Sequence, residues 1–436
     1  MRIVIIGAGP AGTTAALLLG AQHDVVLVDR DPGPAPDGTW ERNGVMQFRQ
    51  PHTFRAPGRL VLERRLPTVH QTLLDVGGIL QVPHGAPEFM ANLHLRREVF
   101  DRVLWDAASA HPGICRRLGH AEDVRVEDGR VTGVVVDGTL VEADLVVDAS
   151  GRSGRFAADH QQPADHVSSN QAYASRLYRL RNDAEPGPLN GGPGYGAEHD
   201  GFFTIVFTHE DGYFTVLVVR AGDDDALAEL RVEKTFERAM AAIPVTAVWT
   251  EPTRAVPVGP VRVGAGLANR YRRQTTDLDG FLSIGDSWCT TNPVAARGVS
   301  FALMAAEALV NVVAEPDPSR WAAAMEAWGA QQLRPWYLEH LVFDEALRRR
   351  WAHETPDPDG PIDWTTLVKA VAERPDFLPV LGPFLGMVAP PASIEPVRRE
   401  LRQMMREGWR PTPPPAPSRD DLVLALAPVS RPGSAA

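Results

Sequence analysis

The apolar positions of the first thirty residues follow two different periods. β-Branched residues fill a predicted strand over 2–6, Ala and Leu dominate up to residue 19, and valines return over 25–28 before Asp29. Apolar runs of this kind are typical of buried parallel strands, and the Ala/Leu-rich stretch between them predicts a helix. The turn between the first strand and the helix consists of Gly7, Ala8, Gly9, Pro10, Ala11 and Gly12. Strand, glycine turn, helix, strand and terminal acid together form the fingerprint of a dinucleotide-binding β-α-β unit.

A second strand, turn and helix are predicted about two-thirds of the way along the chain. A short apolar run from Phe281 to Ile284 ends in Gly285-Asp286, and a turn-rich loop then leads to an apolar helical run over 299–313. An Asp at the end of a strand accepts hydrogen bonds from a ribose or ribitol hydroxyl. A helix N-terminus offers unpaired N–H groups and the positive end of a dipole. The pattern therefore predicts a site for a phosphorylated cofactor.

The middle and the end of the chain show further patterns. Apolar runs at 175–180, 202–208 and 213–219 predict strands of a second sheet. From Pro316 onward the period is helical, up to a proline-rich stretch. The glycine-rich residues 191–196 have no strand before them and no helix after them, so we predict a loop there and one dinucleotide fold in the chain.

Composition and charge exclude several classes of function. The formal net charge of −11 argues against binding of nucleic acid or anionic membranes. Cys115 and Cys289 are the only cysteines, so no disulfide framework is expected and a reducing cytoplasm is the expected location. No Cys/His spacing predicts a metal site. No apolar run reaches the roughly 20 residues of a membrane-spanning helix.

The late loop matches a known loop at four positions. Gly285, Asp286, Pro293 and Gly298 match a G-D-A-A-H loop that continues as P-x-G-x-G, while Cys289 replaces its His and Ala295 replaces one Gly. Together with the N-terminal turn, this loop resembles the FAD domain of the FAD-dependent monooxygenase superfamily, the relatives of p-hydroxybenzoate hydroxylase.

Three other segments carry the same resemblance. Residues 143–155, ADLVVDASGRSGR, look like the strand and turn before the family's D-G motif, with Ser150 in place of Asp. This form is closer to geranylgeranyl-reductase-like flavoproteins, halogenase-like proteins and polyketide epoxidases. Residues 97–101, REVFD, are similar to a helix start whose Arg lies near FAD in those relatives. The stretch 44–52 is similar to one that runs beside the flavin, which implies a contact with FAD for Arg49. The alternative for Arg49 is hydrogen bonding within a surface loop.

The resemblance implies an α/β fold class: a Rossmann-type, GR2-like FAD-binding domain with an inserted mixed β-sheet substrate domain and a helical C-terminal region. That sheet is expected over the reactive face of the flavin. The expected boundaries are 1–80, 97–165 and 276–315 for the FAD-binding domain, 81–96 and 166–275 for the substrate domain, 316–410 for the C-terminal helices, and 411–436 for a flexible Pro-rich tail. The expected FAD contacts are Gly7, Gly9, Pro10, Ala11, Gly12, Asp29, Arg30, Arg49, Arg97, Gly151, Gly285, Asp286, Pro293, Arg297, Gly298 and Val299.

The resemblance also implies the chemistry, because the flavin itself reacts. We expect an FAD-dependent monooxygenase of specialised metabolism that inserts one oxygen atom from O2 into a lipophilic aromatic or alkene metabolite, by hydroxylation or epoxidation, through a flavin hydroperoxide. The side chains expected at the substrate cavity are Arg49, His52, Trp288 and Cys289. Surface hydrogen bonding is an equal alternative for His52. Space filling is the alternative for Trp288 and Cys289.

Other functions stay open at this point. One is an FAD-dependent reductase, dehydrogenase or cyclase of the geranylgeranyl-reductase-like kind, and another is a non-catalytic binding protein that retains the fold. A halogenase is disfavoured because the Trp-x-Trp-x-Ile-Pro segment of that branch is absent, and Lys234 and Lys369 stand in ordinary helical contexts. Electrons come either from NAD(P)H or from a separate flavin reductase, and Ser150 speaks against direct use of NAD(P)H. A monomer or a homodimer is expected.

Overall fold

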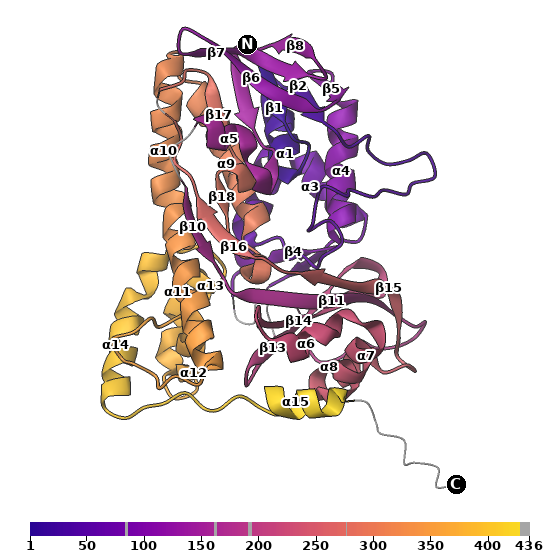
Figure 1. Ribbon diagram of the computed structural model, residues 1–436, viewed down its shortest axis with the longest axis vertical. Helices are drawn as coiled ribbons and strands as arrows, with labels where there is room; N and C mark the ends of the chain where they lie inside the picture. Colours follow the sequence, from indigo (N-terminus) through magenta and orange to yellow (C-terminus); the bar gives the residue numbers. More distant parts are fainter. Residues whose placement is uncertain (83–85, 161–163, 191–193, 276, 428–436) are drawn as a thin grey trace. The chain divides into compact units, whose positions relative to one another are not determined.

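The computed structural model describes residues 1–82, 86–160, 164–190, 194–275 and 277–427 (Figure 1). The chain forms two compact units. The first comprises Met1–Ser169, Ala268–Ala346 and Asp357–Trp409, and the second comprises Asn170–Leu267, Leu347–Pro356 and the described residues from Arg410 onward. Both strand–turn–helix motifs lie in the first unit. Within the described ranges, no helix is long and apolar enough to cross a membrane.

The first unit is built on a five-stranded parallel sheet with the strand order β17-β9-β1-β2-β5. Its strands are β1 (Arg2–Ile6), β2 (Asp24–Asp29), β5 (Ile114–Leu118), β9 (Leu145–Asp148) and β17 (Phe281–Ser283). Because β1, β9 and β17 are parallel neighbours, the turns that follow them start from the same edge of the sheet. Ligands bind at this edge in doubly wound folds. The predicted Rossmann-type fold is confirmed.

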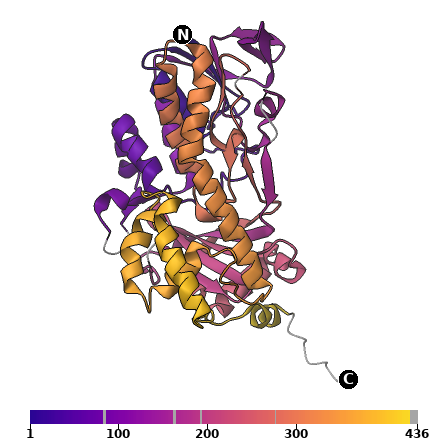
Figure 2. The same cartoon turned by 90° about the vertical axis from the view of Figure 1, so that its left-hand side faces the viewer.

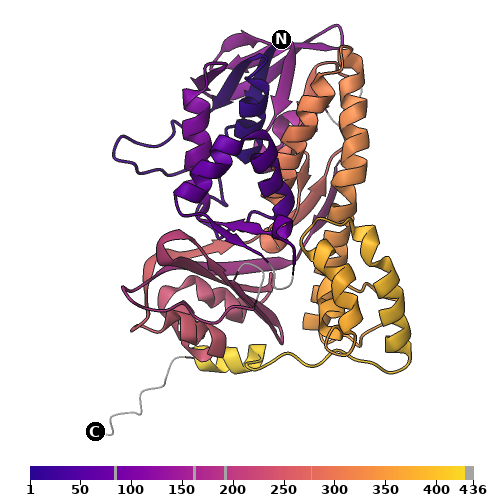
Figure 3. The ribbon, with the colours of Figure 1, turned by 180° about the vertical axis from the view of Figure 1, so that it is seen from behind.

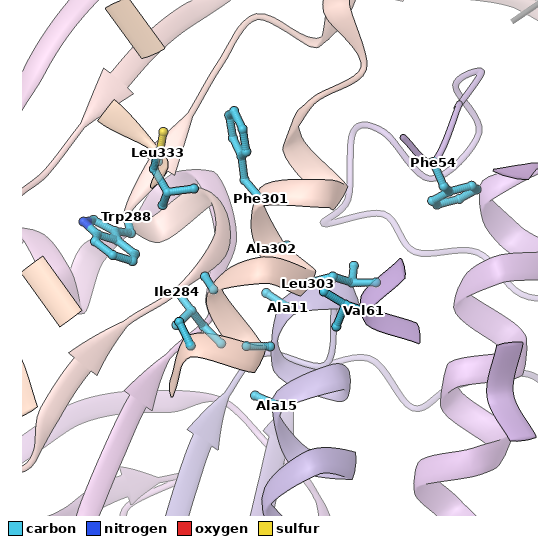
Figure 4. Close-up of a cluster of buried hydrophobic side chains, with 14 of the residues drawn as sticks. Ala11, Ala15, Phe54, Val61, Ile284, Trp288, Phe301, Ala302, Leu303 and Leu333 are labelled. Carbon is cyan, nitrogen blue, oxygen red and sulfur yellow. The ribbon is translucent and has the colours of Figure 1, made fainter. Parts of the chain in front are cut away.

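Two helices pack together behind this edge. Helix α1 (Pro10–Leu19) follows β1, and α9 (Gly298–Val313) follows the loop after β17. Figure 4 shows Ala11 and Ala15 of α1 close to Ala302 of α9. Side chains this small allow two helix backbones to approach each other closely.

The remaining helices of the first unit come from three parts of the chain. The N-terminal part contributes α2 (Ala56–Arg65), α3 (Pro67–Asp75), α4 (Arg97–Ala110) and α5 (Arg155–His160). Helix α10 (Trp321–Gln332) runs beside α9, as Figure 2 shows, and α11 (Arg334–Trp351) begins in this unit. The yellow helices of Figure 3 include α12 (Trp364–Ala370), α13 (Leu378–Leu385) and α14 (Glu395–Arg406), which pack as one group. The helical character predicted beyond Pro316 is confirmed.

Three small antiparallel sheets complete the first unit. They consist of β3 (Ile79–Gln81) with β4 (Asn92–His94), β6 (Ala121–Glu127) with β7 (Arg130–Val136) and β8 (Thr139–Glu142), and β10 (Asp165–Ser168) with β16 (Ala268–Tyr271) and β18 (Cys289–Thr290). The described part of 81–96 therefore belongs to the first unit, whereas we expected it in the substrate domain. The reason is that β4 also bridges, through Leu93, to Phe54 of the same unit.

The second unit contains a five-stranded sheet in the order β12-β13-β14-β11-β15. Its strands are β11 (Gln171–Leu180), β12 (Gly194–His199), β13 (Phe202–Thr208), β14 (Tyr213–Ala221) and β15 (Ala255–Gly264). Every pairing in it is antiparallel, where we expected a mixed sheet. The loop predicted at 191–196 is in part a strand, because Gly194 and Gly196 pair with β13; residues 191–193 lie outside the described residues.

Short helices cover this sheet: α6 (Asp225–Ala228), α7 (Glu233–Ala242), α8 (Pro244–Thr250) and α15 (Arg419–Leu426). Helix α15 lies in the tail that we expected to be flexible. Ser418 and Asp421 form a reciprocal capping box at its start, and Leu422 and Leu426 are buried in the same core as α7. The apolar residues after the prolines therefore order this part of the tail. Residues 428–436 lie outside the described residues.

Candidate cofactor site

The glycine turn after β1 is joined to both neighbouring strands. The Gly7 N–H donates to the carbonyl oxygen of Val28 at 2.8 Å. Gly7 has a φ of +105°, and a Cβ there would overlap the carbonyl oxygen of Ala149, so only glycine fits. A Cβ at Gly9 would meet no atom within 4 Å, which leaves the outer edge of the turn open at the N-terminus of α1. An anion can therefore approach the N–H groups of this turn.

Asp29 at the end of β2 holds the glycine turn in place. Its Oδ2 accepts from the Ala8 N–H at 2.6 Å, and its Oδ1 accepts from the Asp31 N–H at 2.8 Å. The guanidinium of Arg42 lies 3.3 Å from Asp29 Oδ2 and 3.1 Å from Asp31 Oδ2. Both carboxylate oxygens of Asp29 therefore have protein partners, and its predicted contact with a ribose stays a prediction.

Arg42 and Asp101 connect this acid to a second predicted residue. Arg42 Nη1 lies 3.2 Å from Asp101 Oδ2, and Arg97 Nε donates to Asp101 Oδ1 at 2.5 Å. Arg97 Nη1 then reaches His52 Nε2 at 3.1 Å, while His52 Nδ1 lies 2.9 Å from the carbonyl oxygen of Gln50. In this arrangement Nδ1 carries the proton and Nε2 accepts from the arginine. The fold thus links Asp29, Arg97 and His52 in one partly buried polar network.

Sequence reasoning missed the central role of Arg42 and Asp101. Asp101 stands inside the REVFD segment, so the helical spacing of four from Arg97 was a usable signal. Arg42 follows a loop rich in Pro, Gly and Asp, where no periodicity indicates which side chains turn inward.

The turn after β17 packs directly on the first turn of α1. Gly285 has a φ of +66°, and a Cβ there would lie 2.7 Å from the Cβ of Ala11. The next residue, Asp286, is only partly exposed, and its Oδ1 would lie 3.8 Å from a Cβ on Gly298, the first residue of α9. Burial raises the pKa of the Asp286 carboxyl, and Arg152 and Arg97 act in the opposite direction. None of the described residues donates a hydrogen bond to this carboxylate.

The turn after β9 completes the site. Asp148 accepts from the backbone N–H groups of Ser150 at 2.9 Å and Ala157 at 2.9 Å, and burial raises the pKa of its carboxyl. The Ser150 side chain lies beside the Asp148 carboxyl and acts to lower its pKa, against the effect of burial. A Cβ at Gly151 would meet no atom within 4 Å. This turn, too, leaves open space at the edge of the sheet.

Arg49 is occupied by protein contacts, and Arg30 is exposed. Arg49 donates to the carbonyl oxygen of Trp40 at 2.7 Å and to Glu41 at 2.8 Å, and it forms a close ion pair with Glu98. Arg30 is exposed, and its guanidinium lies against the backbone of Gly44. Contacts of these two side chains with FAD remain predictions.

Trp288 and Cys289 are buried. The Trp288 ring lies where a Cβ on Gly329 of α10 would be, and it stacks at a tilt on Trp328 with ring centroids 5.9 Å apart. Burial raises the pKa of the Cys289 thiol. These contacts correspond to the space-filling alternative, and lining of a substrate cavity by either residue stays a prediction.

The loop before α9 brings the last predicted residues together. Pro293 begins a 3-10 turn that the Asn292 side chain caps at the N–H of Val294. Arg297 is buried at 4% exposure, and its Nη1 donates to the carbonyl oxygen of Trp336 at 3.3 Å and lies 3.4 Å from His340 Nδ1. Burial lowers the pKa of Arg297 to about 10. The side chain of Arg297 therefore points to α11, while its backbone precedes Gly298 and Val299 of α9.

These residues fit an FAD molecule. Three turns meet at one edge of the parallel sheet, with free space at Gly9 and Gly151 and an unpartnered carboxylate at Asp286. The N-termini of α1 and α9 offer N–H groups of the kind that bind anions. In the described part of the chain, no group of three or more His, Cys, Asp or Glu side chains is arranged to hold a metal ion.

A family model supplies the decisive comparison. The model described as tryptophan halogenase matches residues 80–331, more than half of the chain. The chain belongs to the tryptophan halogenase family. This membership makes the protein an FAD-dependent oxidoreductase and confirms the resemblance to FAD-dependent monooxygenases and their relatives.

Individual relatives of this tryptophan halogenase family member differ in their chemistry. The chain is 30% identical to the kynurenine 3-monooxygenase of Salinispora arenicola over 187 residues, which are 39% of this chain and 40% of that enzyme. It is 26% identical to digeranylgeranylglycerophospholipid reductase 1 of Methanopyrus kandleri, covering 73% of this chain and 82% of the reductase. The solved structure of the flavin-dependent brominase Bmp2 covers 93% of this chain and is itself covered completely, with a TM-score of 0.68 and 17% identity. At that identity the likeness establishes the fold alone.

The family match bears on our prediction against a halogenase. We disfavoured a halogenase because a short Trp-containing segment and a cavity lysine are missing. The match extends over residues 80–331, so halogenation becomes a direct alternative to oxygenation for this tryptophan halogenase family member. A short motif concerns a few side chains near the reacting atoms, whereas the family match reflects the whole framework around the cofactor.

Proposed function

We propose that this protein is an FAD-dependent monooxygenase that inserts one oxygen atom from O2 into a lipophilic aromatic or alkene metabolite, by hydroxylation or epoxidation. The observation that supports it most is the contact of Gly285 with Ala11, which brings the Gly-Asp turn and the N-terminal glycine turn to one sheet edge. We further propose that it acts in the cytoplasm and in specialised metabolism, as a monomer or a homodimer.

Each turn has a part in holding the cofactor. The backbone N–H groups of Gly9, Ala11 and Gly12 at the start of α1 would hold the pyrophosphate, and Asp286 would accept from a ribitol hydroxyl. The first turn of α9, at Gly298 and Val299, would stabilise negative charge on the flavin ring. When bound, FAD supplies the redox chemistry with O2.

The side chains around the site orient the cofactor and shield it from water, and they do not exchange protons with the substrate. His52 is neutral in its network and is held by Arg97 and Gln50. The carboxylate of Asp148 accepts hydrogen bonds from two backbone N–H groups. Trp288 and Cys289 are buried beside the Gly-Asp turn. A site of this kind keeps water away from the reacting atoms.

The source of electrons is part of the proposal. One parallel dinucleotide-type sheet occurs among the described residues, in the first unit. This supports delivery by a separate flavin reductase, with direct reduction by NAD(P)H as the alternative. Purified protein mixed with NADPH, with and without an added flavin reductase, distinguishes the two by the loss of the flavin absorption band.

Halogenation is the second candidate, because the family model favours it. The test uses FAD-loaded protein, a flavin reductase with NADPH, 1-naphthol as an aromatic probe, ¹⁸O2 and sodium bromide. Product carrying one ¹⁸O atom supports oxygenation, and product with the bromine isotope pattern supports halogenation. Protein that is colourless and takes up no FAD on reconstitution contradicts both candidates.

A further inference from the structure

The N-termini of α2 and α9 meet, and each follows an arginine. Arg55 is the N-cap of α2, and Arg297 is the N-cap of α9. The Ser300 hydroxyl lies 3.4 Å from the carbonyl oxygen of Arg55, and a Cβ on Gly58 would lie 2.9 Å from the Cα of Ser300. Two positive helix ends and two guanidinium groups therefore share one region of the first unit.

The two guanidinium groups flank one aromatic pair. Arg297 lies over the ring of Trp336 at 4.9 Å from its centroid, and Trp336 stacks on Phe384 at 5.2 Å. Arg55 Nη2 donates to the carbonyl oxygen of Leu385, the residue after Phe384. Trp336 and Phe384 are buried, at 5% and 1% exposure. The buried aromatic pair therefore holds the Arg297 guanidinium in place.

Much of the hydrogen-bonding capacity of both arginines is unused. Arg297 is 96% buried, yet only its Nη1 has partners among the described residues. The Nε of Arg55 is buried without a partner, and neither guanidinium forms an ion pair with a described carboxylate. The two nearby acids are engaged elsewhere: Glu339 binds Arg398 with both oxygens at 2.6 and 2.8 Å, and Asp344 accepts from two asparagine side chains.

The electrostatics agree with this geometry. Burial lowers the pKa of Arg55 and of Arg297 to about 10 in each case; the carboxylates of Glu339 and Asp344 act in the opposite direction on Arg297, and the positive charge of Arg55 acts with burial. His340, next to Arg297, has its pKa lowered well below the usual value by burial, so it is neutral and neutralises neither arginine. Burying a charged group whose donors are only partly used is unfavourable, and a bound anion reduces this cost.

We propose that Arg55 and Arg297 bind the carboxylate of a lipophilic substrate. The guanidinium group binds a carboxylate through charge-assisted hydrogen bonds, and both arginines retain N–H donors for them. The proposal rests on the proposed function in taking the ligand to be the substrate. It narrows the substrate class from lipophilic metabolites to lipophilic acids.

The test compares two probes of equal size, 2-naphthoate and the neutral 2-naphthamide, by calorimetric titration of FAD-loaded protein. We expect the wild type to bind naphthoate about tenfold to a hundredfold more tightly than the amide, the range typical of charged hydrogen bonds. Arg297→Gln and Arg55→Gln are expected to bring this ratio close to one while retaining the affinity for the amide. That retained affinity shows that the variants are folded.

The matched control is Arg64→Gln, because Arg64 joins the same two helices through Glu307 at an exposed position. It is expected to leave the ratio of affinities unchanged. Equal affinity of the wild type for both probes, no binding of naphthoate, or an unchanged ratio in both glutamine variants would overturn the proposal. Complete loss of the naphthoate preference in millimolar sodium bromide also overturns it, since an inorganic anion is then the occupant. Colourless protein that still prefers naphthoate contradicts the cofactor assignment but leaves the anion site intact.

Discussion

Gly285 and Ala11 are in contact, although Ala11 lies near the start of the chain and Gly285 lies about two-thirds of the way along it. A Cβ on Gly285 would lie 2.7 Å from the Cβ of Ala11. The contact holds the turn after β17 against the first turn of α1, and Asp286 is thereby directed to the start of α9. Gly285 therefore lies where α1 packs on α9 and where we propose that the cofactor binds.

Gly285→Ala is expected to destabilise the protein and to reduce its FAD content. The backbone at this position has a φ of +66°, and the added methyl group meets Ala11. Strain and overpacking of this kind cost about 1–3 kcal/mol each. Thermal unfolding and the ratio of flavin to protein absorbance measure the two effects. Gly382→Ala in α13 is the control, because its Cβ meets no atom within 4 Å; equal melting temperatures of the two variants would contradict the expectation.

Asp286→Ala is expected to lose FAD. This carboxylate has no hydrogen-bond donor among the described residues, so a cofactor hydroxyl is its proposed partner. Loss of a charge-assisted hydrogen bond weakens binding by about tenfold or more. Equilibrium dialysis against FAD measures the change, with Asp317→Ala as the control because Asp317 is exposed and caps only a short turn. Full flavin content in Asp286→Ala would remove the assignment of this residue.

Asp286→Asn is expected to stabilise the FAD-free protein at pH 7. Burial raises the pKa of this carboxyl in the native state above its pKa in the unfolded state. The native state therefore loses stability, relative to the unfolded state, as the pH rises above the pKa of the unfolded state. The amide has no such cost. The difference in melting temperature between the variant and the wild type should therefore shrink as the pH falls through the raised pKa and the native carboxyl takes up its proton. A difference in melting temperature that grows as the pH falls would contradict this expectation.

Arg42→Leu is expected to destabilise the protein strongly, because it leaves the carboxylates of Asp29 and Asp101 without their shared cation. Breaking a buried ion pair by removing one partner costs about 3–5 kcal/mol. Urea unfolding monitored by tryptophan fluorescence measures the loss. Arg102→Leu removes an exposed arginine that pairs with Asp106 on α4, and a change of about 1 kcal/mol or less is expected there. Similar losses in both variants would argue against a structural role for the network.

Leu422→Ala tests the order that the structure gives to the tail. Leu422 is fully buried in the core of the second unit, and a Leu→Ala change in a core costs about 2–5 kcal/mol. Leu424 lies on the same helix at 74% exposure, so Leu424→Ala is expected to have little effect. Thermal unfolding and limited proteolysis of the two variants measure the difference. Rapid cleavage between 410 and 427 in the wild type would contradict a packed α15.

The local parts of the fold were predictable from the sequence. The strand over 2–6, the helix ending at residue 19 and the turn at Gly285-Asp286 depend on residues that are neighbours in the chain. Hydrophobic period, β-branching and glycine at a left-handed position act over a few residues, so they are visible before folding. The ordering of α15 is an intermediate case: the capping box at Ser418 is local, but the surface that covers Leu422 is not.

The charged networks were decided by the tertiary structure. Arg42 meets Asp101, and Arg55 and Arg297 come together at two helix starts, only because separate segments of the fold converge. The partner of a buried charge depends on where distant segments are packed, and spacing along the chain carries no information about that distance. The sequence alone therefore determined a parallel dinucleotide-type sheet with two glycine turns. Only the packing of distant segments decided which arginines are paired with carboxylates and which retain unused donors.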